Sequence, residues 1–171
     1  MKKKEKQALD NYIAGEYQKF TKIYPKNQDP ILSILRVHLL TEYYLESILC
    51  LLTPRGDKIS KSNLSYFQKL NVLESFDQLD NRIIQSLKNL NKVRNGCAHE
   101  FDKTISESDI ELFGRPLGKE HTKIKHDCVG DFKEYLFQIL YRLCGHLVAE
   151  VWGLEIENIL ENEKGENGTS S

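Results

Sequence analysis

Apolar residues recur three and four positions apart along most of this chain, and this spacing constrains its fold more than any other feature of the sequence. Four segments carry it: residues 31–52, 63–76, 80–98 and 131–152. The spacing is typical of helices that bury one face, and neither an alternating strand pattern of useful length nor an internal repeat occurs. The sequence therefore predicts an all-α bundle.

Prolines and capping residues mark where these segments begin and end. A weaker, polar helix is predicted in residues 1–24, and Pro25 ends it. Pro30 opens the next segment, as expected for a proline in the first turn of a helix. Ser62 is the expected cap of the segment 63–76.

Two stretches lack the helical pattern. Residues 100–126 are predicted to be irregular, apart from a short helix after Ser106, and the polar residues from Glu161 onward are predicted to be disordered. The chain is therefore divided into an N-terminal polar helix and linker (1–29), a helical bundle (30–155) and a mostly disordered polar tail (156–171).

The composition describes one ordinary globular domain of 171 residues, with 40% hydrophobic and 29% charged residues. A formal net charge of −1 excludes a domain-wide positive field, so any nucleic-acid binding has to come from a local patch. The sequence shows no signal peptide and no apolar run long enough to span a membrane, and its four cysteines form no CxxC pair. We expect a cytoplasmic protein with reduced, mostly structural thiols.

One charged residue lies where the helical pattern requires an apolar one. On a helix over 80–98, Ile83, Leu87, Leu90 and Cys97 share a face, and Arg94 falls near the middle of it. A guanidinium in a protein core is costly unless it is paired and hydrogen-bonded. The sequence therefore predicts a partner or a function for Arg94.

The helix over 31–52 offers that partner. Its apolar face is defined by Leu35, Leu39, Leu45 and Leu49. Glu42 falls in the middle of this face and His38 lies one turn earlier, so we expect Glu42 to pair with Arg94 or to orient its guanidinium. The alternative is a buried ion pair that only fixes the register of the helices.

A polar ridge borders Arg94, because Asn91, Asn95 and His99 recur every four residues, with Lys88 and Lys92 on its outer side. Imidazole moves protons near neutral pH, and guanidinium binds phosphate oxygens bidentately. Residues five apart on a helix point about 140° apart. Arg94 and His99 therefore converge only if the helix ends near residue 98, unless a two-fold partner supplies the second set.

Two stretches, Leu64-Ser-Tyr-Phe-Gln-Lys-Leu-Asn-Val-Leu and Leu87-Lys-Asn-Leu-Asn-Lys-Val-Arg-Asn-Gly-Cys-Ala-His, resemble the HEPN superfamily. The mark of that family is an arginine followed after four to six residues by a histidine, often with asparagine directly after the arginine. Arg94, Asn95 and His99 fit this pattern, and the helix that carries His38 and Glu42 resembles the first core helix of such proteins. The resemblance covers about residues 30–150.

The resemblance implies an up-and-down four-helix bundle that forms a homodimer through the motif helices. It also implies a metal-independent endoribonuclease with no cofactor, acting as the toxin or effector of a toxin–antitoxin or abortive-infection system, with a partner such as a minimal nucleotidyltransferase. His99 would serve as general acid or base for attack by the ribose 2′-hydroxyl. Arg94 would stabilise charge on the phosphate oxygens, and Asn95 would orient His99 or bind phosphate.

Other interpretations stay open. Relatives of the mannitol operon repressor type carry a similar motif, so a non-catalytic regulator or adaptor that binds a protein or nucleotide is the alternative function. Gly96, inside the motif, marks either a close approach of a ligand or partner helix, or a fraying helix end. His121, His126 and Cys128 match no usual zinc spacing, and we interpret them as a solvated loop with no metal.

Overall fold

The computed structural model describes the backbone of residues 3–24 and 29–168, and the side chains of residues 7–24 and 29–160. Its helices are α1 (Lys3–Ile23), α2 (Pro30–Leu52), α3 (Gly56–Ile59), α4 (Tyr66–Ser75), α5 (Asn81–His99), α6 (Glu107–Gly114), the 3-10 helix η1 (Arg115–Leu117), α7 (Lys119–Asp127) and α8 (Phe132–Gly168). No strand occurs in the described ranges. The predicted all-α bundle is confirmed.

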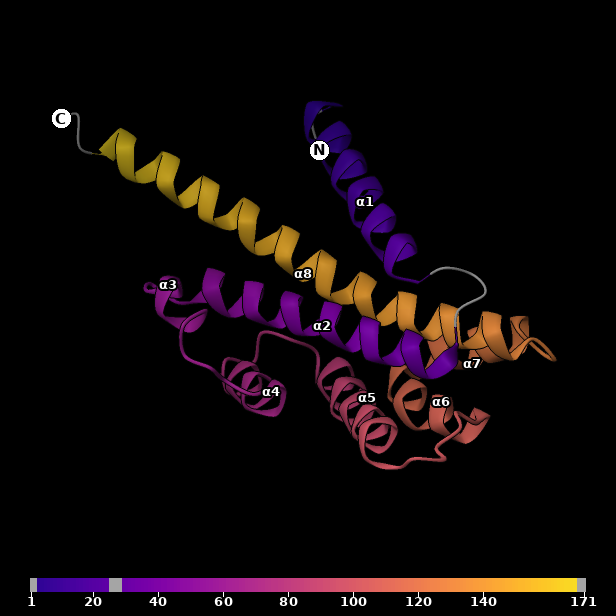
Figure 1. Ribbon diagram of the computed structural model, residues 1–171. Coiled ribbons are helices and arrows are strands. Elements are labelled where there is room, and N and C mark those ends of the chain that lie inside the picture. The colour runs from indigo at the N-terminus through magenta and orange to yellow at the C-terminus, as the bar shows by residue number, and fades with distance from the viewer. Residues whose placement is uncertain (1–2, 25–28, 169–171) are drawn as a thin grey trace.

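Helix α2 lies at the centre of the bundle, with α1 and α8 on one side of it and α4, α5 and α6 on the other (Figure 1). Helices α2 and α8 run in the same direction, because Tyr44 lies near Cys144 while the Asn158 amide donates to the Leu51 carbonyl. The segment α6–η1–α7 leads the chain back after α5, so the two longest core helices are parallel. Helix α1 crosses α8 in the opposite direction.

Capping residues set the starts of the core helices. Asp29 accepts from the backbone amides of Ile31 and Leu32 ahead of α2, and Asp80 accepts from that of Arg82 at the start of α5. Ser106 forms a reciprocal capping box with Asp109, which confirms the short helix expected after it.

The expected cap Ser62 is wrong, because α4 begins three residues later than its position predicts. Ser65 and Gln68 form the capping box of this helix. Asn63, which was expected inside the helix, has a φ of 54° and belongs to the turn that precedes it. The Ser62 hydroxyl donates back to the Ile59 carbonyl instead.

Two stretches expected to be irregular are helical. Residues 100–126 contain α6, η1 and most of α7, with Gly118 at a φ of 64° joining the last two. Ile110, Phe113 and Leu117 are buried and hold this stretch against the core. Helix α8 continues to Gly168, because extending an established helix costs little. Residues 169–171 of the expected tail, like Pro25, lie outside the described residues.

The core is formed mainly by α2, α5 and α8. The expected positions Leu136, Ile139, Leu143 and Leu147 of α8 are buried, as are Ile83, Leu87 and Leu90 of α5. On α2 the expected face is partly wrong, because Leu39 is 61% exposed. The segment is apolar on nearly every side, so the spacing did not identify the buried side, which carries Ile34, Val37, Leu45 and Ile48.

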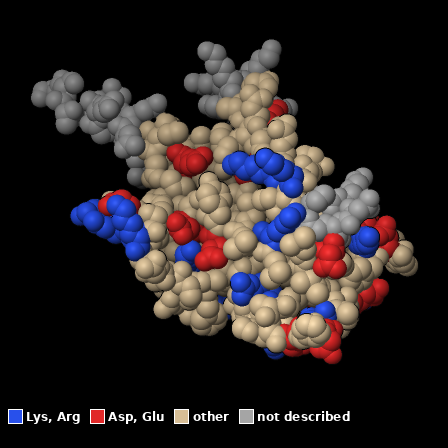
Figure 2. All heavy atoms as spheres, in the orientation of Figure 1, with Lys and Arg blue, Asp and Glu red and all other residues tan. Residues whose placement is uncertain are grey.

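Positive and negative side chains are interspersed over the visible face of the molecule, in keeping with the net charge of −1 (Figure 2). In the ranges that the structure describes, no helix has both the length and the apolar character needed to cross a bilayer.

Candidate functional site

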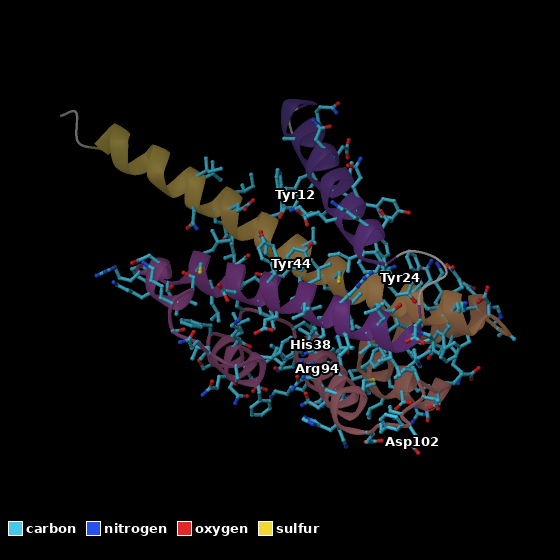
Figure 3. The ribbon with its side chains drawn as sticks, in the orientation of Figure 1. Tyr12, Tyr24, His38, Tyr44, Arg94 and Asp102 are labelled. Carbon is cyan, nitrogen blue, oxygen red and sulfur yellow. The ribbon has the colours of Figure 1, made fainter. Side chains whose placement is uncertain are left out.

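His38 of α2 points toward α5, where it meets the polar ridge (Figure 3). Its side chain is almost fully buried, with 3% of the residue exposed, and its Nε2 lies 2.9 Å from Asn91 Oδ1. Because an amide oxygen only accepts, Nε2 carries the proton in this arrangement and Nδ1 does not. His38 Nδ1 has no hydrogen-bond partner among the described residues.

The burial of His38 favours its neutral form. Desolvation lowers the pKa of His38, the hydrogen bond to Asn91 opposes this, and the positive charge of Arg94 lowers the pKa further. The ring stacks on Tyr66 at a centroid distance of 4.0 Å. The Tyr66 hydroxyl lies 3.0 Å from Thr41 Oγ1, which donates to the His38 carbonyl. We call His38, Thr41, Tyr66 and Asn91 the polar junction.

Glu42 does not pair with Arg94, and this expectation is wrong. Its carboxylate accepts from Lys69 Nζ of α4 at 3.0 Å, and Glu46 accepts from the same ammonium at 2.9 Å. Lys69 is only 5% exposed. Burial lowers the pKa of Lys69, but the two carboxylates outweigh this effect and the pKa is raised. Lys69 is therefore charged, and Glu42 has the structural role of holding α2 against α4.

Arg94 is half-exposed rather than buried in the core. Its Nη1 donates to the Asn95 side-chain oxygen at 3.1 Å, and no carboxylate among the described residues lies within ion-pair distance of the guanidinium. The core side of this turn is occupied by Leu90 and Val93. The side chain lies beside His38 between α2 and α5 (Figure 3). Arg94 thus keeps hydrogen-bonding capacity for an anion.

Asn95 and His99 are exposed on the last turns of α5. Helix α5 includes His99, so the side-chain directions of Arg94 and His99 keep their separation of about 140°. Within one chain these two groups do not converge on one phosphate. We call Arg94, Asn95 and His99 the helix end.

The remaining members of the ridge divide between the inside and the outside of the protein. Asn91 is taken up by the polar junction, as described above. Lys88 donates to Glu74 of α4 at 2.8 Å, which reduces its availability for RNA, whereas Lys92 is exposed.

Gly96 and Cys97 occupy different sides of the last turn. A Cβ added at Gly96 would meet only the side chains of Glu100, at 3.3 Å, and Lys103, at 3.9 Å. No other described residue lies close enough to require a glycine there. Cys97 packs partly buried against the core, and burial raises the pKa of its thiol, so it is a packing residue as expected.

The structure does not bring His121, His126 and Cys128 together as a metal site. His121 is buried in α7, which corrects its assignment to a solvated loop, and its Nε2 lies 2.7 Å from the Tyr135 hydroxyl. His126 is exposed. Among the residues with described side chains, no group of three or more His, Cys, Asp or Glu residues is placed to hold a metal ion.

Two important residues, Lys69 and Tyr66, were missed from the sequence. Both lie on the buried side of α4 with Leu70 and Leu73. A lysine in that position is the same kind of signal that drew attention to Arg94. Glu42 and Glu46, one turn apart on α2, are its matching carboxylates. The apolar spacing of residues 63–76 includes Phe67 and Phe76, but both are about half exposed, and the buried side of α4 instead includes Tyr66 and Lys69.

Comparisons with protein-family models, curated proteins and solved structures gave no match for this chain. Its function is therefore inferred from its own residues.

Proposed function

We propose that this protein is a metal-independent endoribonuclease of the HEPN type, with the helix end as its catalytic group. The observation that carries the proposal is the state of Arg94. Its guanidinium is half-exposed and, among the residues with described side chains, bonds only a neutral amide, next to an exposed histidine on the same helix end. A structural arginine of this kind is usually paired with a carboxylate, and an arginine left without one is suited to phosphate.

The reaction follows from these groups. The base form of His99 removes the proton from a ribose 2′-hydroxyl, and the resulting oxygen attacks the adjacent phosphorus. The bond to the 5′-oxygen breaks, leaving a 2′,3′-cyclic phosphate on one product, and a proton returns to the 5′-oxygen to give a hydroxyl. Arg94 stabilises the charge on the non-bridging oxygens. RNA is the substrate because the nucleophile is the 2′-hydroxyl.

A homodimer completes the site in this proposal. Since Arg94 and His99 diverge on one helix, a two-fold axis beside the helix end would place Arg94 of one copy near His99 of the other. An exposed apolar residue of α2 supports a second copy as the partner, because Leu39 is 61% exposed and adjacent to His38 in sequence. We further propose a role as the toxin or effector of a cytoplasmic defence system, with a protein antitoxin such as a minimal nucleotidyltransferase.

The test is digestion of total and synthetic RNA by the purified protein in the presence of EDTA. Wild type is compared with Arg94→Ala and His99→Ala, and with Arg55→Ala and His126→Ala as matched exposed controls. We expect cleavage by wild type and both controls, with cyclic phosphate and 5′-hydroxyl ends, and cleavage at least about a hundredfold slower by the helix-end variants. If wild type cleaves no RNA, or if the helix-end variants cleave as well as the controls, the proposal is wrong.

A second candidate function is a non-catalytic regulator or adaptor. The observation that favours it is the divergence of Arg94 and His99 within one chain, because a single anion-binding arginine suffices for a binding module. This candidate predicts a folded protein that cleaves no RNA and that loses a protein or nucleotide partner when Arg94 is replaced.

A further inference from the structure

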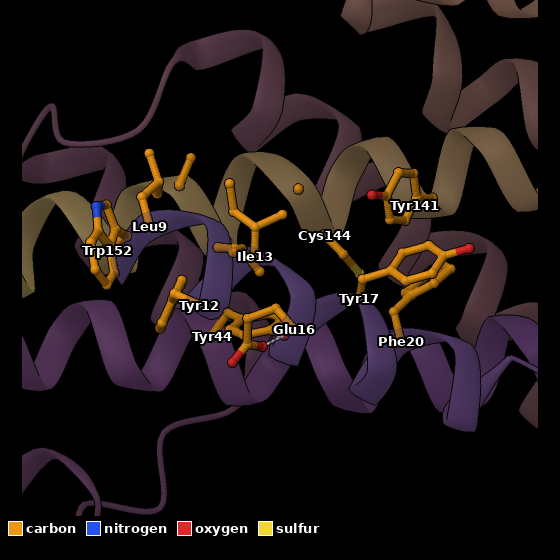
Figure 4. A pocket seen from close by; sticks show the side chains of 13 residues that line it. Leu9, Tyr12, Ile13, Glu16, Tyr17, Phe20, Tyr44, Tyr141, Cys144 and Trp152 are labelled. Carbon is orange, nitrogen blue, oxygen red and sulfur yellow. Dashed lines mark hydrogen bonds between the residues drawn. The ribbon is translucent and has the colours of Figure 1, made fainter. Parts of the chain in front are cut away.

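Helices α1, α2 and α8 enclose a cavity of about 410 Å³ on the side of the bundle away from the helix end. Six aromatic side chains line it: Tyr12, Tyr17, Phe20, Tyr44, Tyr141 and Trp152 (Figure 4). Small residues of α8, Gly145 and Ala149, keep part of its wall open. The proposed ribonuclease chemistry makes no use of this space.

Glu16 of α1 is the one ionisable carboxylate in the lining of this cavity, and it is only 8% exposed. Its Oε2 accepts from the Tyr44 hydroxyl at the cavity wall (Figure 4). Its Oε1 accepts from Lys19, whose side chain is 54% exposed and extends toward solvent. A buried carboxylate thus faces an aromatic cavity, and its only cationic partner lies at the rim.

The electrostatic surroundings of the cavity favour a positive ligand. Burial raises the pKa of Tyr12 to about 12, and the negative charges of Glu155 and Glu16 act in the same direction. Aromatic faces attract a cation through the ring quadrupole, and more strongly when the cation is desolvated. A carboxylate-bearing ligand would instead meet Glu16 and be repelled.

We propose that this cavity binds an organic ammonium ion with an apolar body. The apolar part fills the space between Tyr17, Tyr141 and Trp152, and the ammonium group pairs with Glu16. Lys19 then gives up its bond to Glu16 and extends into water, which its exposure allows.

The probes that test this share one apolar body and differ in head group: 4-phenylbutylamine, 4-phenylbutan-1-ol and 4-phenylbutyrate. Trp152 is the single tryptophan of the chain and lines the cavity, so its fluorescence reports binding directly. We expect the amine to bind at least about tenfold more tightly than the alcohol, and the carboxylate most weakly. Equal affinities for amine and alcohol, tightest binding of the carboxylate, or no fluorescence change with any probe would each overturn the proposal.

Four variants of the full chain sharpen the test. Glu16→Gln should remove the preference for the amine, whereas Glu157→Gln, an exposed position outside the cavity, should leave it intact. Lys19→Met should strengthen amine binding several-fold, because it frees Glu16 without deleting it. Ala149→Phe should block all three probes, with far-UV circular dichroism confirming the fold. Unchanged binding in Ala149→Phe, or weaker amine binding in a folded Lys19→Met variant, contradicts the proposal.

Discussion

Asn91 of the polar junction and the helix end lie on consecutive turns of α5, yet their polar groups are satisfied in different ways. Asn91 is bonded to His38 across the α2–α5 contact, and the neighbouring charge Lys69 is held by two carboxylates. One turn after Asn91, the side chains of Arg94 and Asn95 bond to each other and to no other side chain that the structure describes. The partly buried residue of the ridge, Asn91, therefore stabilises the contact between α2 and α5. The exposed residues, together with Arg94, can still form hydrogen bonds with a ligand.

The sequence pattern alone does not distinguish polar residues that stabilise the fold from polar residues that can bind a ligand, whereas their hydrogen bonds do. Polar residues on an apolar helix face indicate a ligand-binding site only where no other group of the protein forms hydrogen bonds with them. By that criterion Glu42, whose carboxylate binds Lys69, is structural, and Arg94, Asn95 and His99 remain candidates. His38 is satisfied in part, because Asn91 bonds its Nε2 while its Nδ1 has no partner among the described residues.

The largest expected effect is on catalysis. Arg94→Ala should lower the rate of RNA cleavage by about 10²–10³-fold, because it removes the charge that stabilises the transition state. The melting temperature should change little, since the side chain is half-exposed and has no ion-pair partner among the described residues. Initial rates on a fluorogenic RNA and thermal melts measure both. A large drop in melting temperature with unchanged cleavage would show that Arg94 is structural and not catalytic.

Lys69→Met should produce the opposite pattern. It leaves Glu42 and Glu46 one turn apart without their shared cation, so we expect a loss of about 2–3 kcal/mol in the free energy of unfolding. The value lies below that of a fully buried pair, because both carboxylates are partly exposed. Urea denaturation measures it, and the triple variant with Glu42→Gln and Glu46→Gln should recover most of the loss. No loss in Lys69→Met would show that this ion cluster is not structural.

Stability should fall as the pH drops below about 6.5, the ordinary pKa of a histidine side chain. The pKa of His38 is lowered in the folded state, so the unfolded chain takes up the proton first and acidification favours unfolding. The slope is at most about 1.4 kcal/mol per pH unit for one histidine. His121, whose pKa burial also lowers, contributes in the same direction. His38→Gln should reduce the slope of the unfolding free energy against pH, and the exposed control His126→Gln should not. Equal slopes in all three proteins would contradict a buried, neutral His38.

Gly96→Ala gives the smallest expected effect. The added methyl group meets only the movable side chains of Glu100 and Lys103, so we expect a gain of up to about 1 kcal/mol in helix stability. Chemical denaturation and sedimentation velocity measure stability and dimer formation. Weaker dimer formation in this variant would instead mean that a partner helix approaches Gly96 closely.

Much of the fold could be predicted from the sequence, whereas less of the site could. Helix α5 has a strong apolar stripe and an aspartate cap, so its limits were predicted within one residue. Helix α2 is apolar on nearly every side, so the exposure of Leu39 and the partner of Glu42 depended on tertiary packing. The short helix after Ser106 was predicted, but η1 and α7 were missed because both are short and lie beside Gly114, Pro116 and Gly118, and packing stabilises them more than local propensity does.

The central claim is that two copies of the helix end form each catalytic site, and mixing two inactive variants tests it most directly. Arg94→Ala and His99→Ala are unfolded together, refolded at equal concentration and assayed on RNA with EDTA. Half of the randomly formed dimers are mixed and carry one intact site of two, so about one quarter of wild-type activity should return. If the mixture is as inactive as either variant alone, the site does not span the two-fold axis and the account is contradicted.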